Sequence, residues 1–131
     1  INVENDTADD GGRTVAVDGD GIDDAGGDSQ EDASTDEVTF EFADPNSTDI
    51  TYQVDNFSGD DVLDFSAVQG GTEAEFAVLS DASQDDGEQD IRVTNTNTTN
   101  EFIVTLTGLT SQQDSNVFNQ SSFENEFGLI L

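Results

Sequence analysis

The chain has 131 residues, of which 31 are Asp or Glu and only two, Arg13 and Arg92, are basic, so its formal net charge is −29. Nucleic acid and anionic membrane surfaces are excluded as partners, because both are bound through basic side chains that this chain lacks. Cys, His and Lys are absent, which excludes disulfides, thiol or imidazole metal ligands, a histidine general base and a lysine Schiff base.

Residues 1–36 differ in composition from the rest of the chain, being rich in Asp, Gly, Ser and Ala and containing no Phe. Such a composition is typical of loops and linkers, and low hydrophobicity with high net charge favours disorder. One apolar alternation, at residues 14–17, predicts a single strand there. We therefore expect two parts, an acidic leader or linker at residues 1–36 that carries a candidate calcium loop, and a β domain at residues 37–131.

From Glu37 onward, apolar and polar residues alternate in short runs separated by turn residues, which is the pattern of half-buried strands. In the first run, Val38, Phe40 and Phe42 share one face. Strands are predicted at residues 38–42, 50–54, 61–65, 74–79, 91–94 and 101–106, the last two forming a hairpin across the polar tract at residues 95–100. Residues 111–123 are the only stretch that suggests a short helix, and residues 127–131 end the chain as an apolar strand.

No long period of 3.6 residues is present, so we predict an all-β fold. The expected architecture is a short-strand β-sandwich or a capped β-roll-like domain with an extended acidic N-terminal segment. Its core must be modest, because only 32% of the residues are hydrophobic and nine Phe supply much of the apolar surface. No apolar run approaches the roughly 20 residues that span a bilayer, so membrane insertion is not expected.

Four motifs occur in an order that is found in a known family. Residues 36–42 resemble the strand D-T-F-x-F, residues 49–57 the following strand D-x-I-x-D-F, and residues 59–66 the turn and strand G-x-D-x-[IL]-D-[LF]-S. Residues 102–109 resemble the late strand T-V-x-L-x-G-[VL], and Glu126 is followed by apolar residues, as in many type I secretion substrates. In these motifs the chain resembles the C-terminal β domain of repeats-in-toxin (RTX) proteins.

The resemblance to RTX proteins implies export through a type I channel in an unfolded state, followed by folding with calcium outside the cell, either secreted or at the cell surface. A polyanion that stays expanded at low calcium and condenses at high calcium is consistent with the coupling of metal binding to folding. The family's calcium-binding repeat, G-G-x-G-x-D-x-U-x, survives only in fragments such as Gly11-Gly12 and Gly26-Gly27-Asp28.

The sharpest candidate metal site is the run VDGDGIDD at residues 17–24. Oxygen ligands suit hard cations, above all calcium, and alternate Asp residues separated by Gly let a tight loop aim several carboxylates at one ion. The run is similar to the D-x-D-G-D-G-I-x-D calcium loops of thrombospondin type 3 repeats, with Ala16 in place of the first Asp. The alternative is a flexible acidic linker. The candidate ligands here are Asp18, Asp20, Asp23, Asp24 and Asp28.

A second acidic group surrounds the turn between two predicted strands. Asp55, Asp60, Asp61 and Asp64 are candidate ligands of a calcium ion that joins strand ends, and the alternative is turn chemistry alone, because Asp favours turns without a metal. A third group is better explained as a solvated loop; it comprises Asp81, Asp85, Asp86, Glu88 and Asp90. Catalysis is not expected, because carboxylate pairs arise by chance in so acidic a chain and no Trp is present to line a sugar site.

These features predict a non-enzymatic, calcium-dependent extracellular structural domain that belongs to an adhesin, a surface layer or a filament. The apolar strands at residues 14–17 and 127–131 are expected to support self-association into a homo-oligomer or filament, because each needs a sheet edge or groove to cover it. One alternative is the secretion and folding module of a larger enzyme, such as a protease or lipase; the start at Ile1 favours a processed form or part of a larger protein. Another is a halophile surface protein whose acidity serves hydration only.

Overall fold

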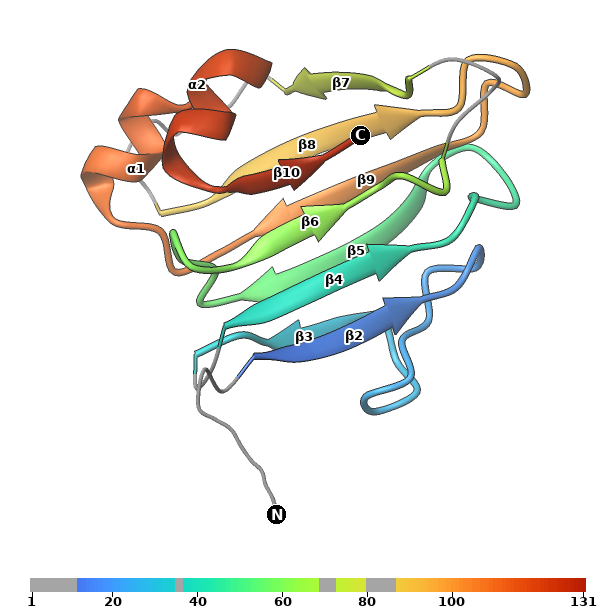
Figure 1. The fold of residues 1–131 in the computed structure, drawn as a ribbon, viewed down its shortest axis with the longest axis horizontal. Coiled ribbons are helices and arrows are strands. Elements are labelled where there is room, and N and C mark those ends of the chain that lie inside the picture. Colours follow the sequence, from blue (N-terminus) through green and yellow to red (C-terminus); the bar gives the residue numbers. More distant parts are fainter. Residues whose placement is uncertain (1–11, 35–36, 69–72, 80–86) are drawn as a thin grey trace.

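The structure is a computed structural model that describes residues 12–34, 37–68, 73–79 and 87–131. Two β-sheets lie one in front of the other, with two short helices beside one end of them (Figure 1). The described strands are β2 (Arg13–Val17), β3 (Gln30–Asp32), β4 (Val38–Phe42), β5 (Ile50–Asp55), β6 (Val62–Asp64), β7 (Glu75–Val78), β8 (Gln89–Thr94), β9 (Glu101–Leu106) and β10 (Gly128–Ile130). The helices are α1 (Ser111–Asn116) and α2 (Gln120–Glu126).

Strands β2 to β6 alternate between the two sheets, so that this part of the chain winds as a coil. The first sheet has the order β10-β6-β4-β2 with every pair parallel. The second has the order β3-β5-β9-β8-β7, in which β3, β5 and β9 are parallel and β8 and β7 are antiparallel additions. Arg13 pairs with Val38, 25 residues later, and Gln30 with Gln53, 23 residues later. The fold is therefore mainly β, built from two sheets whose parallel strands come from successive coils.

Aromatic side chains from both sheets meet in the core between them. The ring of Phe42 stacks on that of Phe65 with centroids 4.4 Å apart, and it meets Tyr52 and Phe102 edge-on at 5.7 and 5.1 Å. All four residues are buried. Because β4 and β6 belong to the first sheet and β5 and β9 to the second, this cluster fastens the two sheets together.

The helices close the end of the core that lies beside β7 and β8. Phe123 of α2 is buried against Phe57, Phe76 and Phe127, with ring centroids 5.0 to 6.3 Å away. Both helices begin with a capping box, which satisfies two backbone N–H groups that have no partner within the helix. After α2 the chain enters β10, which pairs with β6.

The strands predicted from alternation at residues 38–42, 50–54, 61–65, 74–79, 91–94 and 101–106 are confirmed within one or two residues at either end. The hairpin across residues 95–100 is confirmed as the antiparallel pair β8 and β9. The single helix suggested at residues 111–123 is two helices, because Val117 is extended and Asn119 caps a second one.

The expected division at residue 36 is not matched by the structure. Strands β2 and β3 belong to the two sheets, and Val15, Val17 and Ala33 lie in the same buried core as the later strands. An extended acidic segment is therefore wrong for residues 12–34, where a few apolar side chains are enough to anchor one coil. The sheet edge that residues 127–131 were expected to need lies within the chain itself, because Phe127 is buried and β10 pairs with β6. Among the described residues, no helix is long and apolar enough to cross a membrane.

Replacing Phe42 with Ala should lower the free energy of unfolding by about 3–5 kcal/mol, because a large aromatic side chain is removed from the contact between the sheets. Urea denaturation at constant salt measures this loss. Phe118→Ala is the matched control, since that side chain is 70% exposed and its removal should change stability by less than about 0.5 kcal/mol. Equal losses in the two variants would contradict the placement of the core.

Candidate functional site

The acidic loop (residues 18–24) uses its first carboxylate to hold its own backbone. Oδ1 of Asp18 accepts hydrogen bonds from the N–H groups of Asp20 and Ile22 at 2.9 and 3.1 Å. The N–H of Asp18 donates to the carbonyl of Ile22 at 2.9 Å, and the N–H of Gly21 donates to the carbonyl of Asp18 at 2.9 Å. This is the turn chemistry typical of Asp, in which a side chain replaces a backbone acceptor.

The glycines of the acidic loop are required by close contact with the next coil. A Cβ on Gly19 would lie 2.6 Å from the carbonyl oxygen of Asp44 and 2.6 Å from Oδ1 of Asn46. Gly21 has a φ of +82°, and a Cβ there would lie 2.8 Å from the carbonyl oxygen of Thr51. Asn46 also donates from its side chain to Oδ1 of Asp20 at 2.7 Å. The Asp-Gly spacing that suggests a calcium loop therefore has a second cause, the packing of this loop on the coil that follows.

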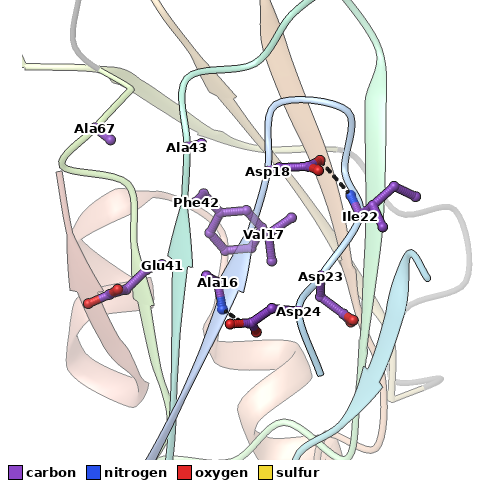
Figure 2. A pocket seen from close by; sticks show the side chains of 10 residues that line it. All are labelled: Ala16, Val17, Asp18, Ile22, Asp23, Asp24, Glu41, Phe42, Ala43 and Ala67. Carbon is purple, nitrogen blue, oxygen red and sulfur yellow. Dashed lines mark hydrogen bonds between the residues drawn. The ribbon is translucent and has the colours of Figure 1, made fainter. Parts of the chain in front are cut away.

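The two adjacent carboxylates at the end of the loop have different hydrogen-bond partners. Asp23 is buried and accepts the Tyr52 hydroxyl hydrogen bond at 2.6 Å, together with the N–H groups of Gly26 and Gly27 at 2.9 and 3.2 Å. Asp24 is exposed, and its Oδ1 accepts the N–H of Ala16 in β2 at 3.0 Å. Figure 2 shows the two side chains apart from each other, so they do not converge on one point.

Burial raises the pKa of Asp23, but the hydrogen bonds from Tyr52 and from the backbone outweigh it, and the net pKa lies below the ordinary value of 3.8. Burial and the bond to Asp23 both raise the pKa of the Tyr52 hydroxyl, which therefore stays protonated and remains a donor. This pair connects the first coil to the centre of the core across 29 residues of sequence.

Asp61 is a fully buried carboxylate that joins two coils. Its Oδ1 accepts the N–H of Val38 at 2.9 Å, and its Oδ2 accepts the N–H of Ser58 at 2.9 Å and the Ser58 hydroxyl at 3.3 Å. Burial raises the pKa of Asp61 above 3.8, and these hydrogen bonds offset the rise only in part. The residue fixes the start of β4 against the turn before β6.

The remaining candidate ligands lie in separate places. Asp55 accepts hydrogen bonds from the side chains of Gln30, of Gln53 at 2.7 Å and of Thr107 at 2.9 Å. Asp28 accepts the N–H of Gln30 at 3.4 Å, and Asp64 accepts the N–H of Ser66 at 2.9 Å. Asp60 is exposed next to Asp61 in sequence.

Calcium takes six to eight oxygen ligands, and the described residues do not bring that many of the predicted ones together. Eight of the nine predicted ligands accept hydrogen bonds from protein groups, all except Asp60. Within the described part of the chain, no group of three or more Asp or Glu is placed so as to hold a metal ion. Of the third acidic group, Asp81, Asp85 and Asp86 lie outside the described residues, and Asp90 accepts the Thr105 hydroxyl at 2.7 Å.

A cavity of about 440 Å³ lies beside the acidic loop, and the sequence analysis did not predict it (Figure 2). Its lining is mainly apolar, and the acidic residues that border it are Asp18, Asp23, Asp24 and Glu41. Its walls come from the first three coils, so no local sequence signal could reveal it.

No protein-family model matches the chain, and the comparisons with curated proteins and with solved structures give no match either. The likeness to RTX proteins therefore stays a resemblance of motifs. Function has to be argued from the geometry of this chain alone.

Two of the buried carboxylates, Asp23 and Asp61, should titrate on opposite sides of pH 3.8. Asp23, with its lowered pKa, contributes stability that is complete above pH 3.8 and is lost as the pH falls through its folded value. Asp61, with its raised pKa, has the opposite sign, so its ionisation costs stability as the pH rises through its folded value. Carboxyl ¹³C NMR titration of the folded protein measures both midpoints, with Asp23→Asn and Asp61→Asn identifying the signals. An Asp23 midpoint above that of Asp61 would contradict these environments.

Proposed function

We propose that the chain is a non-catalytic structural domain of a secreted or cell-surface protein, built as a short stack of coils that folds where cations are abundant. The observation that carries the proposal is the parallel register of successive coils, with paired strands 23 to 25 residues apart. Asp23 and Asp61, two of the buried polar side chains, hold turns and neighbouring coils in place. The hydrogen bonds of these two buried carboxylates thus stabilise the architecture.

The winding of the chain supports the β-roll-like alternative rather than a sandwich of antiparallel sheets. In the first sheet, β2, β4, β6 and β10 are all parallel, which requires the chain to cross to the other side between them. The hairpin of β8 with β9, the strand β7 and the two helices lie at the end far from β2 and β3, where they act as a cap (Figure 1). The resemblance to the C-terminal domain of RTX proteins points in the same direction and is part of the proposal.

Cations enter the proposal through the charge of the folded surface. A chain with 31 acidic and two basic residues opposes its own compaction unless counterions reduce the repulsion. Within the described ranges no three Asp or Glu are grouped so as to hold one ion, which supports cations that screen the surface in general. Dependence on calcium in particular is the competing proposal, and its support is the motif resemblance together with the acidity.

Circular dichroism during refolding separates these two proposals. In EDTA, we expect molar NaCl to restore the full β signal, because screening suffices. In a parallel sample without EDTA, millimolar calcium should add no more β signal than its ionic strength supplies. Magnesium at the same concentration is the control and should match calcium. A β signal that requires calcium and saturates at a fixed number of ions per chain would contradict general screening. If no cation gives a β signal, the proposal of a folded structural domain is contradicted.

A further inference from the structure

The first coil presents one backbone edge of each sheet. Strand β2 pairs with β4 and β3 pairs with β5, and among the described residues no further strand pairs with either of them. At the end of β2, Val17 forms an antiparallel bridge with Asp23 of the same coil. A strand edge offers rows of N–H and C=O groups to a strand of another molecule, and proteins that remain monomeric block such edges.

The hydrogen bonds at the two ends of β2 show which of its backbone groups face outward. In a parallel pair, alternate residues of an edge strand direct their backbone groups toward the partner strand, and the residues between them direct theirs away. The N–H of Arg13 donates to Glu37, and the carbonyl of Val17 accepts from Ala43, so both face β4. The backbone groups of Ala16 therefore face the open side.

The same reasoning applies to β3. The carbonyl of Ser29 accepts from Gln53, and the N–H of Ala33 donates to the carbonyl of Asp55, so these groups face β5. The backbone groups of Gln30 and Asp32 therefore face the open side. These groups, those of Ala16 and those of Thr14, which faces the same way as Ala16, are the ones that an added strand would need.

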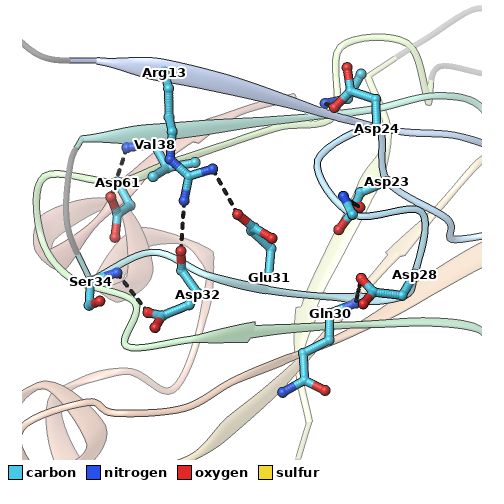
Figure 3. Close-up of polar contacts among 12 residues, drawn as sticks. Arg13, Asp23, Asp24, Asp28, Gln30, Glu31, Asp32, Ser34, Val38 and Asp61 are labelled. Atoms are coloured by element: carbon cyan, nitrogen blue, oxygen red, sulfur yellow. Dashed lines mark hydrogen bonds and ion pairs between the residues drawn. The ribbon is translucent and has the colours of Figure 1, made fainter.

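The first coil itself already occupies part of these groups: both groups of Ala16, the carbonyl of Asp32 and, at 3.4 Å, the N–H of Gln30. Asp24 binds Ala16 twice, because its N–H donates to the carbonyl of Ala16 and its Oδ1 accepts the N–H of Ala16, both at 3.0 Å. Arg13 reaches from β2 to β3, where Nη2 donates to the carbonyl of Asp32 at 2.7 Å and Nη1 pairs with Glu31 at 2.7 Å. Figure 3 shows Arg13 between the two strands, with Asp28 beside Gln30.

We propose that Asp24 and Arg13 form an edge cap, which prevents a second copy of the chain from adding a strand to β2 or β3. Repulsion between copies cannot do this alone where cations are abundant, because the screening length falls to about 3 Å at 1 M salt. The cap instead occupies hydrogen-bonding groups of the edge, namely both backbone groups of Ala16 and the carbonyl of Asp32. It also places the end of the acidic loop beside Ala16. The inference goes beyond the proposed function, since the cap acts whichever cation supports folding. It also opposes the exchange of residues 14–17 between subunits.

The test compares two double variants of the whole chain with identical net charge. Asp24→Ala with Arg13→Gln removes both side chains of the cap and leaves the backbone bond from the N–H of residue 24 to the carbonyl of Ala16. Asp20→Ala with Arg92→Gln removes one acidic and one basic side chain that do not touch the edges of β2 or β3. Sedimentation velocity in molar NaCl should give the 13.9 kDa monomer for the wild type and the control, and a larger mass that grows with concentration for the cap variant. Asp24→Asn, which keeps an oxygen acceptor for Ala16, should remain monomeric. A folded cap variant that stays monomeric would overturn the proposal.

Amide hydrogen exchange makes the test independent of how well the cap variant folds. In the wild type, the amide of Ala16 should exchange at least tenfold more slowly than in an unfolded chain, since Asp24 holds it. In Asp24→Ala it should lose that protection, while the amide of Val104 in β9 keeps its own. If the variant does not fold, the wild-type amide decides the question, because an unprotected Ala16 means that the edge is open and the cap does not exist.

Discussion

The contact of each coil with the next determines where every other feature of this structure can lie. Parallel pairing of β2 with β4 and of β4 with β6 brings Val15, Phe40 and Leu63 into one row across the first sheet. The same stacking leaves no room for a side chain at Gly19, which lies against the backbone of Asp44. The core, the turns and the edge of the sheet all follow from this repeated register.

Stacking also gives several acidic residues a structural role, which is to accept hydrogen bonds from backbone N–H groups. In a chain with so few basic residues, carboxylates can rarely form ion pairs, and backbone N–H groups are their most available donors. Asp18, Asp24 and Asp61 each accept such groups, and in doing so they fix a turn, an edge and a contact between coils. The ion pair of Arg13 with Glu31 is partly exposed and worth about 1 kcal/mol or less, so its main effect is to place a donor at the carbonyl of Asp32.

Local alternation was enough to predict most of the strands, because a half-buried strand has alternating apolar and polar residues, as Val38 to Phe42 do. It did not predict β3, whose sequence Gln30-Glu31-Asp32 has no apolar face and which forms only through pairing with β5. Composition misassigned residues 12–34 for a related reason, since Val15 and Val17 suffice to anchor a coil once β4 lies beside them. The candidate site was harder to predict from the sequence than the strands were. Asp-Gly spacing is the same in an ion-binding loop and in a loop packed on another coil, and the partner that separates the two readings, Tyr52 for Asp23, lies 29 residues away.

The most direct test of the coil register uses the absence of Cys from the chain. Thr14 and Thr39 are paired neighbours on the outer face of the first sheet, whereas Thr51 is exposed on the second. Adjacent strands lie about 4.8 Å apart, which is within the Cα separation that a disulfide can join. The variant carrying Thr14→Cys and Thr39→Cys should therefore form an intramolecular cross-link when the folded protein is oxidised, visible as faster migration on a non-reducing gel, and the variant carrying Thr14→Cys and Thr51→Cys should not. Equal cross-linking of the two variants, or none in the first, would contradict a stack of parallel coils.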